Sequence, residues 1–141
     1  MKKLLTITLL IAICLTSLSL ISCGNKIDAE GLWEDATYRT DKSFGKGEKT
    51  VTVDVIVEDK SVTFTIKTDK ETLGDALIEH QLIEGEDGPF GLYVKKVNGI
   101  YADYDTDGYY WGLQKNGETC MTGVDATIIS DGEHYELVLT K

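Results

Sequence analysis

The segment "TVTVDVIVEDKSVTFTIKTD", residues 50–69, decides the class of fold because its apolar residues recur at every second position. Such alternation over two adjacent runs predicts two β-strands that each bury one face. Asp59 and Lys60 separate the two runs and predict the turn of a hairpin. The side chains expected on the buried face are Val51, Val53, Val55, Val57, Val62, Phe64 and Ile66.

Helical spacing begins directly after this hairpin, in "TLGDALIEHQLIEG", residues 72–85. Apolar residues at intervals of three and four predict an α-helix with one buried face. Thr72 and Asp75 fit an N-terminal capping pair, because the threonine oxygen can accept a hydrogen bond from a free backbone N–H. Gly85 is a candidate for the C-terminal end of the helix. The expected face comprises Leu73, Ala76, Leu77 and, at its edge, His80.

Three further segments predict strands in the second half of the chain: residues 92–100, 108–123 and 134–140. Within the second of these, Asn116 and Gly117 supply the two positive-φ positions of a type I′ hairpin turn. A hairpin, one helix and three or more further strands define an α+β fold. We expect a β-grasp-like mixed sheet of about five to six strands with one helix packed on one face.

The residues before the hairpin carry weaker signals. The segment "LWEDATYR", residues 32–39, alternates loosely and predicts a strand at the edge of the sheet. Residues 40–50, "TDKSFGKGEKT", show no period and predict a loop. We therefore divide the chain into a leader at 1–22, a tether and lead-in segment at 23–47, and one domain at 48–141.

The N-terminal 23 residues, "MKKLLTITLLIAICLTSLSLISC", have two lysines followed by a long apolar run. This pattern predicts a signal peptide, and Leu20-Ile21-Ser22-Cys23 matches a bacterial lipobox. An ordinary secretory signal and a transmembrane helix are the alternatives. The Ser-Cys end and the polar residues that follow it favour processing. We expect a lipoprotein acylated at Cys23, with chains such as palmitate, on the extracytoplasmic side of the cell membrane.

Charge and cysteine content exclude two classes of function. The 141-residue chain has a formal charge of −10, and removing Lys2 and Lys3 with the leader takes it to about −12. Such a surface repels phosphate backbones, so we expect no nucleic-acid partner. Once Cys23 is acylated, Cys120 remains alone in the mature part, and no intrachain disulfide can form. A single thiol of this kind is typical of a small buried residue and not of a nucleophile.

Asp103, Asp105, Asp107 and Gly108 match the first half of a calcium-binding loop. A complete loop needs a bidentate glutamate at its twelfth position, and Gln114 stands there. A helix should also follow, whereas the sequence predicts a strand. We therefore expect a solvated acidic loop, no metal site, and calcium affinity no tighter than about 10⁻⁴ M.

Aromatic residues are concentrated in the same region: Tyr101, Tyr104, Tyr109, Tyr110 and Trp111. Tyrosine and tryptophan give large contact area and a polar tip at low rotamer entropy, which suits ligand binding. The same residues would also serve as ordinary strand residues, half of them pointing into the core. Both interpretations stay open on the sequence alone.

The mature chain resembles the transcobalamin-like C-terminal domain family, also described as a bacterial domain of unknown function, and in particular its Gram-positive lipoprotein members. The resemblance covers residues 50–141 and extends into the lead-in. It is carried by the segments "VTVDVIV…VTFTI", "TLGDAL", "YVKKVNGI", "YYWGLQKNG", "TGVDATII" and "DGEHYELVL".

In the vitamin carriers of this family, the similar domain closes over cobalamin together with an α-helical domain, which we do not expect in this chain. The resemblance implies that Trp111, Leu113 and the segment "TGVD" (122–125) lie near a ligand face. With the aromatic cluster, the predicted ligand-binding residues are Tyr104, Tyr109, Trp111, Leu113, Gly123 and Val124.

No catalytic motif is found, and His80 and His134 stand alone in their segments, so we expect no enzyme. The sequence predicts a lipid-anchored, non-catalytic binding module for a small ligand such as a cobalamin-like corrinoid, with no certain cofactor. Such a module would be linked to uptake through a transporter component. The alternative is a surface module for protein interaction or adhesion that binds no small ligand.

Overall fold

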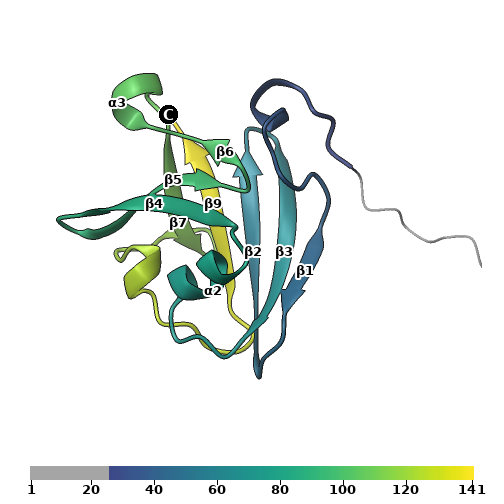
Figure 1. The fold of residues 1–141 in the computed structure, drawn as a ribbon, viewed down its shortest axis with the longest axis vertical. Helices are drawn as coiled ribbons and strands as arrows, with labels where there is room; N and C mark the ends of the chain where they lie inside the picture. The colour runs from purple at the N-terminus through teal and green to yellow at the C-terminus, as the bar shows by residue number, and fades with distance from the viewer. Residues whose placement is uncertain (1–25) are drawn as a thin grey trace, which may run out of the picture.

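The computed structural model describes residues 26–141, which form two β-sheets and several short helices (Figure 1). The predicted signal peptide and Cys23 lie outside these described residues. No helix within the described range is long and apolar enough to cross a membrane. The helical elements are η1 (Gly31–Trp33), α2 (Leu73–Glu79), α3 (Tyr104–Asp107) and η2 (Val124–Ala126). The strands are β1 (Lys42–Gly45), β2 (Lys49–Val57), β3 (Lys60–Thr68), β4 (Ile83–Gly88), β5 (Gly91–Val97), β6 (Ile100–Tyr101), β7 (Tyr110–Lys115), β8 (Glu118–Thr119) and β9 (His134–Thr140).

The larger sheet has six strands in the order β1-β3-β2-β9-β7-β8. It is mixed, because β9 joins β2 and β1 joins β3 in parallel while the other pairs are antiparallel. Figure 1 shows α2 and the smaller sheet β4-β5-β6 on the same face of this sheet. The predicted α+β class, with a mixed sheet and one helix on one face, is confirmed. The separate three-stranded sheet was not predicted.

The hairpin of β2 and β3 has the predicted inner face, and its turn lies at Glu58 and Asp59, one residue before the predicted Asp59 and Lys60. Val53 lies opposite Phe64, and Val55 lies opposite Val62. Every apolar residue expected on the inner face is buried. The chain reverses at Glu58, which takes a left-handed conformation with φ of 58°. Alternation in the sequence therefore determined which face of this hairpin packs on the core.

Helix α2 begins as predicted. The Thr72 hydroxyl accepts a hydrogen bond from the backbone N–H of Asp75 at 3.2 Å. Leu73, Ala76 and Leu77 are fully buried against the large sheet. The helix is short, and its stability comes from this buried face more than from its length.

The predicted role of Gly85 as the end of the helix is wrong. The helix ends at Glu79, and Gln81 turns the chain with a φ of 58°. Gly85 lies instead inside β4, where a side-chain Cβ would be 2.3 Å from the carbonyl oxygen of Tyr93. Gly85 therefore permits the close approach of β4 and β5 at a bulge and does not end the helix.

The predicted edge strand at residues 32–39 and loop at 40–50 are also wrong. The first region is the turn η1, because Trp33 inserts into the core with 2% of its surface exposed. The edge strand is β1, Lys42–Gly45, which runs parallel to β3. Ile27, Trp33 and Ala36 of the lead-in thus belong to the same core as the rest of the domain. The boundary at residues 47 and 48 stays a prediction from sequence.

The hairpin of β7 and β8 has the predicted turn, with φ of 51° at Asn116 and 80° at Gly117. Trp111 and Leu113 are buried and Tyr110 is exposed, so the alternation in β7 is as predicted. This register places Trp111 opposite Leu139 of β9. It brings the inner face of β7 beneath β5, where the site described next is formed.

Candidate functional site

A cleft of about 370 Å³ opens between β5, β7 and the segment that follows β8. We call it the β5–β7 cleft. Strand β5 contributes Leu92, Tyr93 and Val94; β7 contributes Trp111, Gly112 and Leu113; the turn before β5 contributes Phe90; β9 contributes Leu137; and residues 119–124 complete it. Its volume falls within the range of small-molecule sites, which are mostly apolar with a few polar groups.

The floor of the cleft is held rigidly by core packing. Trp111 is 8% exposed, and its Nε1 donates a hydrogen bond to the carbonyl of Ile100 at 3.2 Å. Leu113 is buried beside it, and its carbonyl accepts from the backbone N–H of Cys120 at 2.9 Å. Val124 is buried at the start of η2. A ligand would therefore meet a preformed apolar surface.

The rim of the cleft has the opposite character. Phe90, in the turn between β4 and β5, is 99% exposed, and Met121, after β8, is 97% exposed. Neither side chain contributes to the packing of the core. Two large apolar side chains in water beside an apolar cleft are typical of a surface that binds something.

Cys120 is the one thiol in the described part of the chain and lines this cleft. Burial raises the pKa of Cys120 above its usual value, and Lys115 offsets only part of this effect. The thiol is therefore protonated at neutral pH and is a poor nucleophile. The other polar side chains of the cleft, Thr119, Thr122 and Tyr93, are hydrogen-bonding groups, which suits binding more than catalysis.

The cleft unites four of the six predicted ligand-binding residues: Trp111, Leu113, Gly123 and Val124. Gly123 lies before η2, and its carbonyl accepts from the Thr127 hydroxyl at 2.7 Å. Sequence reasoning missed Phe90 and Met121 at the rim. The signal available for Phe90 was a large aromatic residue within the turn "GPFG". Binding by any of these residues stays a prediction.

Tyr104 and Tyr109 do not line the cleft. Tyr104 is exposed on α3, and its ring lies 6.2 Å from that of Tyr110 in a T-shaped arrangement. Tyr109 is partly buried, with the Lys141 ammonium 5.2 Å from its ring centre. The tyrosine cluster of the sequence is therefore divided: Tyr104 and Tyr110 are exposed, whereas Tyr109, just before β7, is partly buried.

The acidic segment is solvated as predicted, with Asp105 and Asp107 exposed, but it contains a short helix, α3, in place of a loop. Asp103 caps this helix by accepting from the backbone N–H of Asp105 at 3.1 Å. Partial desolvation would raise the pKa of Asp103, but the Asp105 N–H, Lys95 and the Tyr101 hydroxyl together lower it. Its carboxylate already has protein donors. Within residues 26–141, no three His, Cys, Asp or Glu side chains are grouped to hold a metal ion.

A polar cluster on the opposite face of the large sheet was not anticipated from sequence. His134 Nδ1 lies 2.7 Å from the Thr52 hydroxyl, and His134 Nε2 lies 3.0 Å from Asp54. The Thr63 hydroxyl donates to Asp54 at 2.6 Å. The cluster crosses three adjacent strands outside the cleft, on a flat sheet face, and links those strands side by side.

Residues 70–140 match the family described as Domain of unknown function (DUF4430), and the chain belongs to this family. A candidate metal-binding protein from Ruminococcus gnavus ATCC 29149 is 38% identical, with a TM-score of 0.63 over 67% of this chain and 98% of that chain. Haptocorrin, in a crystal structure with Cbi, is 20% identical, with a TM-score of 0.57 over 70% of this chain. No match was found among curated proteins.

Haptocorrin shares the fold, and the matched region is 26% of its chain. The fold expected from the transcobalamin-like resemblance is therefore found in a protein crystallised with Cbi. These two structures are of a candidate metal-binding protein and of a protein crystallised with Cbi, and neither is described as an enzyme.

Proposed function

We propose that the mature chain is a lipid-anchored, extracytoplasmic binding module whose β5–β7 cleft takes a small ligand with a large apolar surface. The observation that carries this proposal is the pairing of a buried apolar floor with two fully exposed apolar side chains, Phe90 and Met121. A cobalamin-like corrinoid is the first candidate ligand, supported by the fold shared with haptocorrin. The module would deliver its ligand to a transporter component.

The size of the cleft limits how such a ligand could sit. A volume of about 370 Å³ is near the lower end for small-molecule sites. A corrinoid ring is larger than this cleft, so it would be held by one edge or face, with Phe90 and Met121 against the ring. Affinity would then be moderate unless a second protein covers the exposed part.

Metal binding, for which the Ruminococcus gnavus protein is a candidate, is less well supported for this chain. The described residues group no three potential ligands, and Asp103 is already hydrogen-bonded. Hard cations such as calcium need six or more oxygen ligands. The cleft offers hydroxyl groups and one protonated thiol among apolar walls, a poor match to that requirement.

We expect Phe90→Ser and Met121→Ser each to weaken binding of a corrinoid about 10-fold or more. Covering such a side chain is worth about 1.5–3 kcal/mol, and 1.4 kcal/mol is a factor of ten in affinity. Calorimetric titrations with cobalamin, cobinamide and haem measure the change. Both residues are solvent-exposed, so the melting temperature should stay the same.

Ile128→Ser is the matched control, because Ile128 is 67% exposed and lies outside the cleft. Its ligand affinity should equal that of the unmodified protein. Equal affinity in all three variants would place the ligand elsewhere. Failure of every probe to bind the unmodified protein would count against a small apolar ligand.

A second candidate function is protein interaction or adhesion. It is favoured by the exposed tyrosines Tyr101, Tyr104 and Tyr110 near α3, because exposed tyrosine is enriched at binding surfaces. A partner protein that loses affinity for Tyr104→Ala but not for Phe90→Ser would favour this candidate over the first.

The membrane anchor rests on the lipobox ending at Cys23, which lies outside the described residues. We expect Cys23→Ser to prevent acylation and to release or misprocess the protein, because the thiol is the acylated group. Fractionation of cells and the intact mass of the product measure both effects. Unchanged membrane retention and unchanged mass would contradict the proposed anchor.

A further inference from the structure

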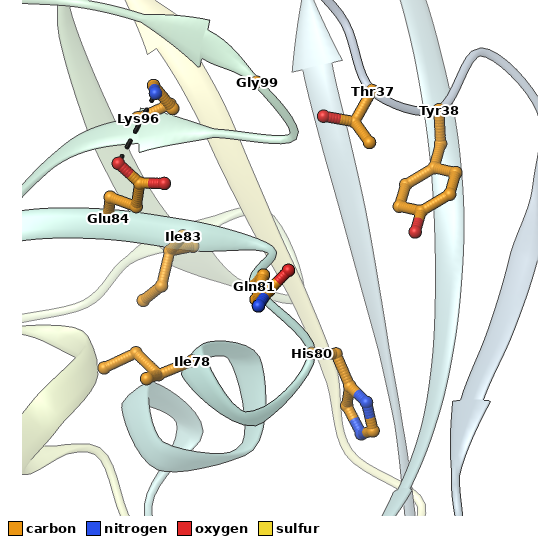
Figure 2. A pocket seen from close by; sticks show the side chains of 9 residues that line it. All are labelled: Thr37, Tyr38, Ile78, His80, Gln81, Ile83, Glu84, Lys96 and Gly99. Atoms are coloured by element: carbon orange, nitrogen blue, oxygen red, sulfur yellow. Dashed lines mark ion pairs between the residues drawn. The ribbon is translucent and has the colours of Figure 1, made fainter.

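A second and larger pocket, of about 510 Å³, lies at the other end of the β4–β5 hairpin from the β5–β7 cleft (Figure 2). We call it the lead-in pocket, because Thr37 and Tyr38 of the lead-in segment form one wall. The C-terminal end of α2, the start of β4 and the turn between β5 and β6 form the others. The two sites share no lining residue.

The wall of the lead-in pocket is fixed by one buried side chain. Asn98 is 1% exposed, and its side chain accepts from the backbone N–H of Tyr38 at 2.9 Å and donates to the Tyr38 carbonyl at 2.7 Å. Its backbone carbonyl accepts from the N–H of Thr37, and its own N–H donates to the carbonyl of Leu82, both at 2.8 Å. A fully satisfied buried network of this kind holds one geometry.

A neighbouring glycine makes the close approach of these segments feasible. At Gly99, where φ is 81°, a Cβ would lie 2.5 Å from the Asp35 carbonyl oxygen and 2.7 Å from the Thr37 hydroxyl. The ring of Tyr38 is held against Phe44, with ring centres 5.4 Å apart. The lead-in pocket is therefore preformed, because contacts within the protein fix its walls.

The lining combines an apolar side with hydrogen-bonding groups. Figure 2 shows Ile78 and Ile83 together on one side, with Thr37 and Tyr38 across from them. Within residues 26–141, the hydroxyls of Thr37 and Tyr38 and the side-chain amide of Gln81 make no hydrogen bond to another residue. These groups can both donate and accept.

Two opposite charges of the lead-in pocket pair with each other, and His80, which also lines the pocket, has a buried Nε2 with no hydrogen-bond partner among residues 26–141. Lys96 Nζ lies 3.4 Å from the Glu84 carboxylate, and both line the pocket. An anion would gain little from this neutral pair on a chain of net charge −10. A cation would have to displace Lys96 from Glu84. The pocket best fits a neutral ligand.

We propose that the lead-in pocket binds a short neutral saccharide of one or two sugar units. A sugar ring has an apolar face, which matches the half-exposed Ile78 beside the buried Ile83, and several hydroxyls, which match Thr37, Tyr38 and Gln81. In this pair, the Glu84 carboxylate can accept a hydrogen bond from a sugar hydroxyl, and the Lys96 ammonium can donate one, without a change in net charge. This site is independent of ligand binding in the β5–β7 cleft.

The test is a panel of neutral mono- and disaccharides, at about 10 mM because small polar ligands bind weakly, monitored by protein NMR. We expect at least one saccharide to shift the amide resonances of Gln81, Lys96 and Gly99 and to leave those of Met121 and Gly123 unchanged. Shifts confined to the β5–β7 cleft, or no shift with any sugar, would overturn the proposal. This readout needs no variant and is unaffected by folding defects.

Glu84→Gln and Thr37→Val should each weaken saccharide binding about 10-fold, as expected from the loss of a hydrogen bond. Glu86→Gln is the matched control, because Glu86 lies on the same strand and pairs with Lys95 at 3.1 Å outside this pocket. Its affinity should not change. Equal loss in Glu84→Gln and Glu86→Gln would overturn the proposal, as would stronger binding of anionic sugars or peptides. Phe90→Ser should bind the saccharide normally, which separates this result from the corrinoid test.

Discussion

Replacing Trp33 with alanine is expected to lower the free energy of unfolding by about 3–5 kcal/mol, as truncation of a large buried aromatic residue does. Trp33 is 2% exposed, and its Nε1 donates to the carbonyl of Val57 at the end of β2. The substitution would leave a cavity in the core and remove this hydrogen bond. Chemical denaturation followed by circular dichroism measures the change.

Two controls separate these causes. Trp33→Phe keeps a six-membered aromatic ring in the core and loses the five-membered ring with its N–H, so it should cost less than Trp33→Ala. Glu34→Ala changes the exposed neighbour and should stay within about 0.5 kcal/mol of the unmodified protein. A cost below about 1 kcal/mol for Trp33→Ala would mean that the lead-in is dispensable for the domain.

The importance of the lead-in could not be predicted from its sequence. A 3₁₀ turn of three residues and a parallel edge strand of four leave no periodic pattern. Trp33 is buried because of a contact with Val57, 24 residues away, and β1 forms because β3 offers it an open edge. Strong alternation in β2 and β3, by contrast, predicted both strands and the buried face, because that signal is local.

The residues of the β5–β7 cleft and of the lead-in pocket also differ in how far the sequence alone indicates them. Trp111 and Leu113 were found because they alternate in a strand and match a known family. Phe90 and Met121 were missed because an exposed apolar residue in a turn has no pattern to mark it. The lead-in pocket depends on Asn98, which joins residues 60 positions apart in the chain. Contacts between residues so far apart in the chain form only when the whole domain folds, so no local pattern in the sequence indicated the pocket.

Trp111→Ala is expected to cost about 3–5 kcal/mol of unfolding free energy and also to abolish ligand binding in the β5–β7 cleft. The residue is 8% exposed and donates to Ile100, so it is part of the core, yet it also lines the cleft. Tyr110→Ala changes the opposite, exposed face of β7. It should change stability by less than about 1 kcal/mol and leave binding intact.

The double role of Trp111 requires a variant that separates folding from binding. Trp111→Phe keeps an aromatic ring in the core but loses the hydrogen bond to Ile100 and part of the surface that faces the cleft. It should fold, with a stability loss smaller than that of Trp111→Ala, and should bind a corrinoid several-fold more weakly. If Trp111→Phe folds and binds with unchanged affinity while Phe90→Ser does not, the ligand contacts the rim of the cleft and not its floor. Trp111 would then act only through the packing that holds β7 beneath β5.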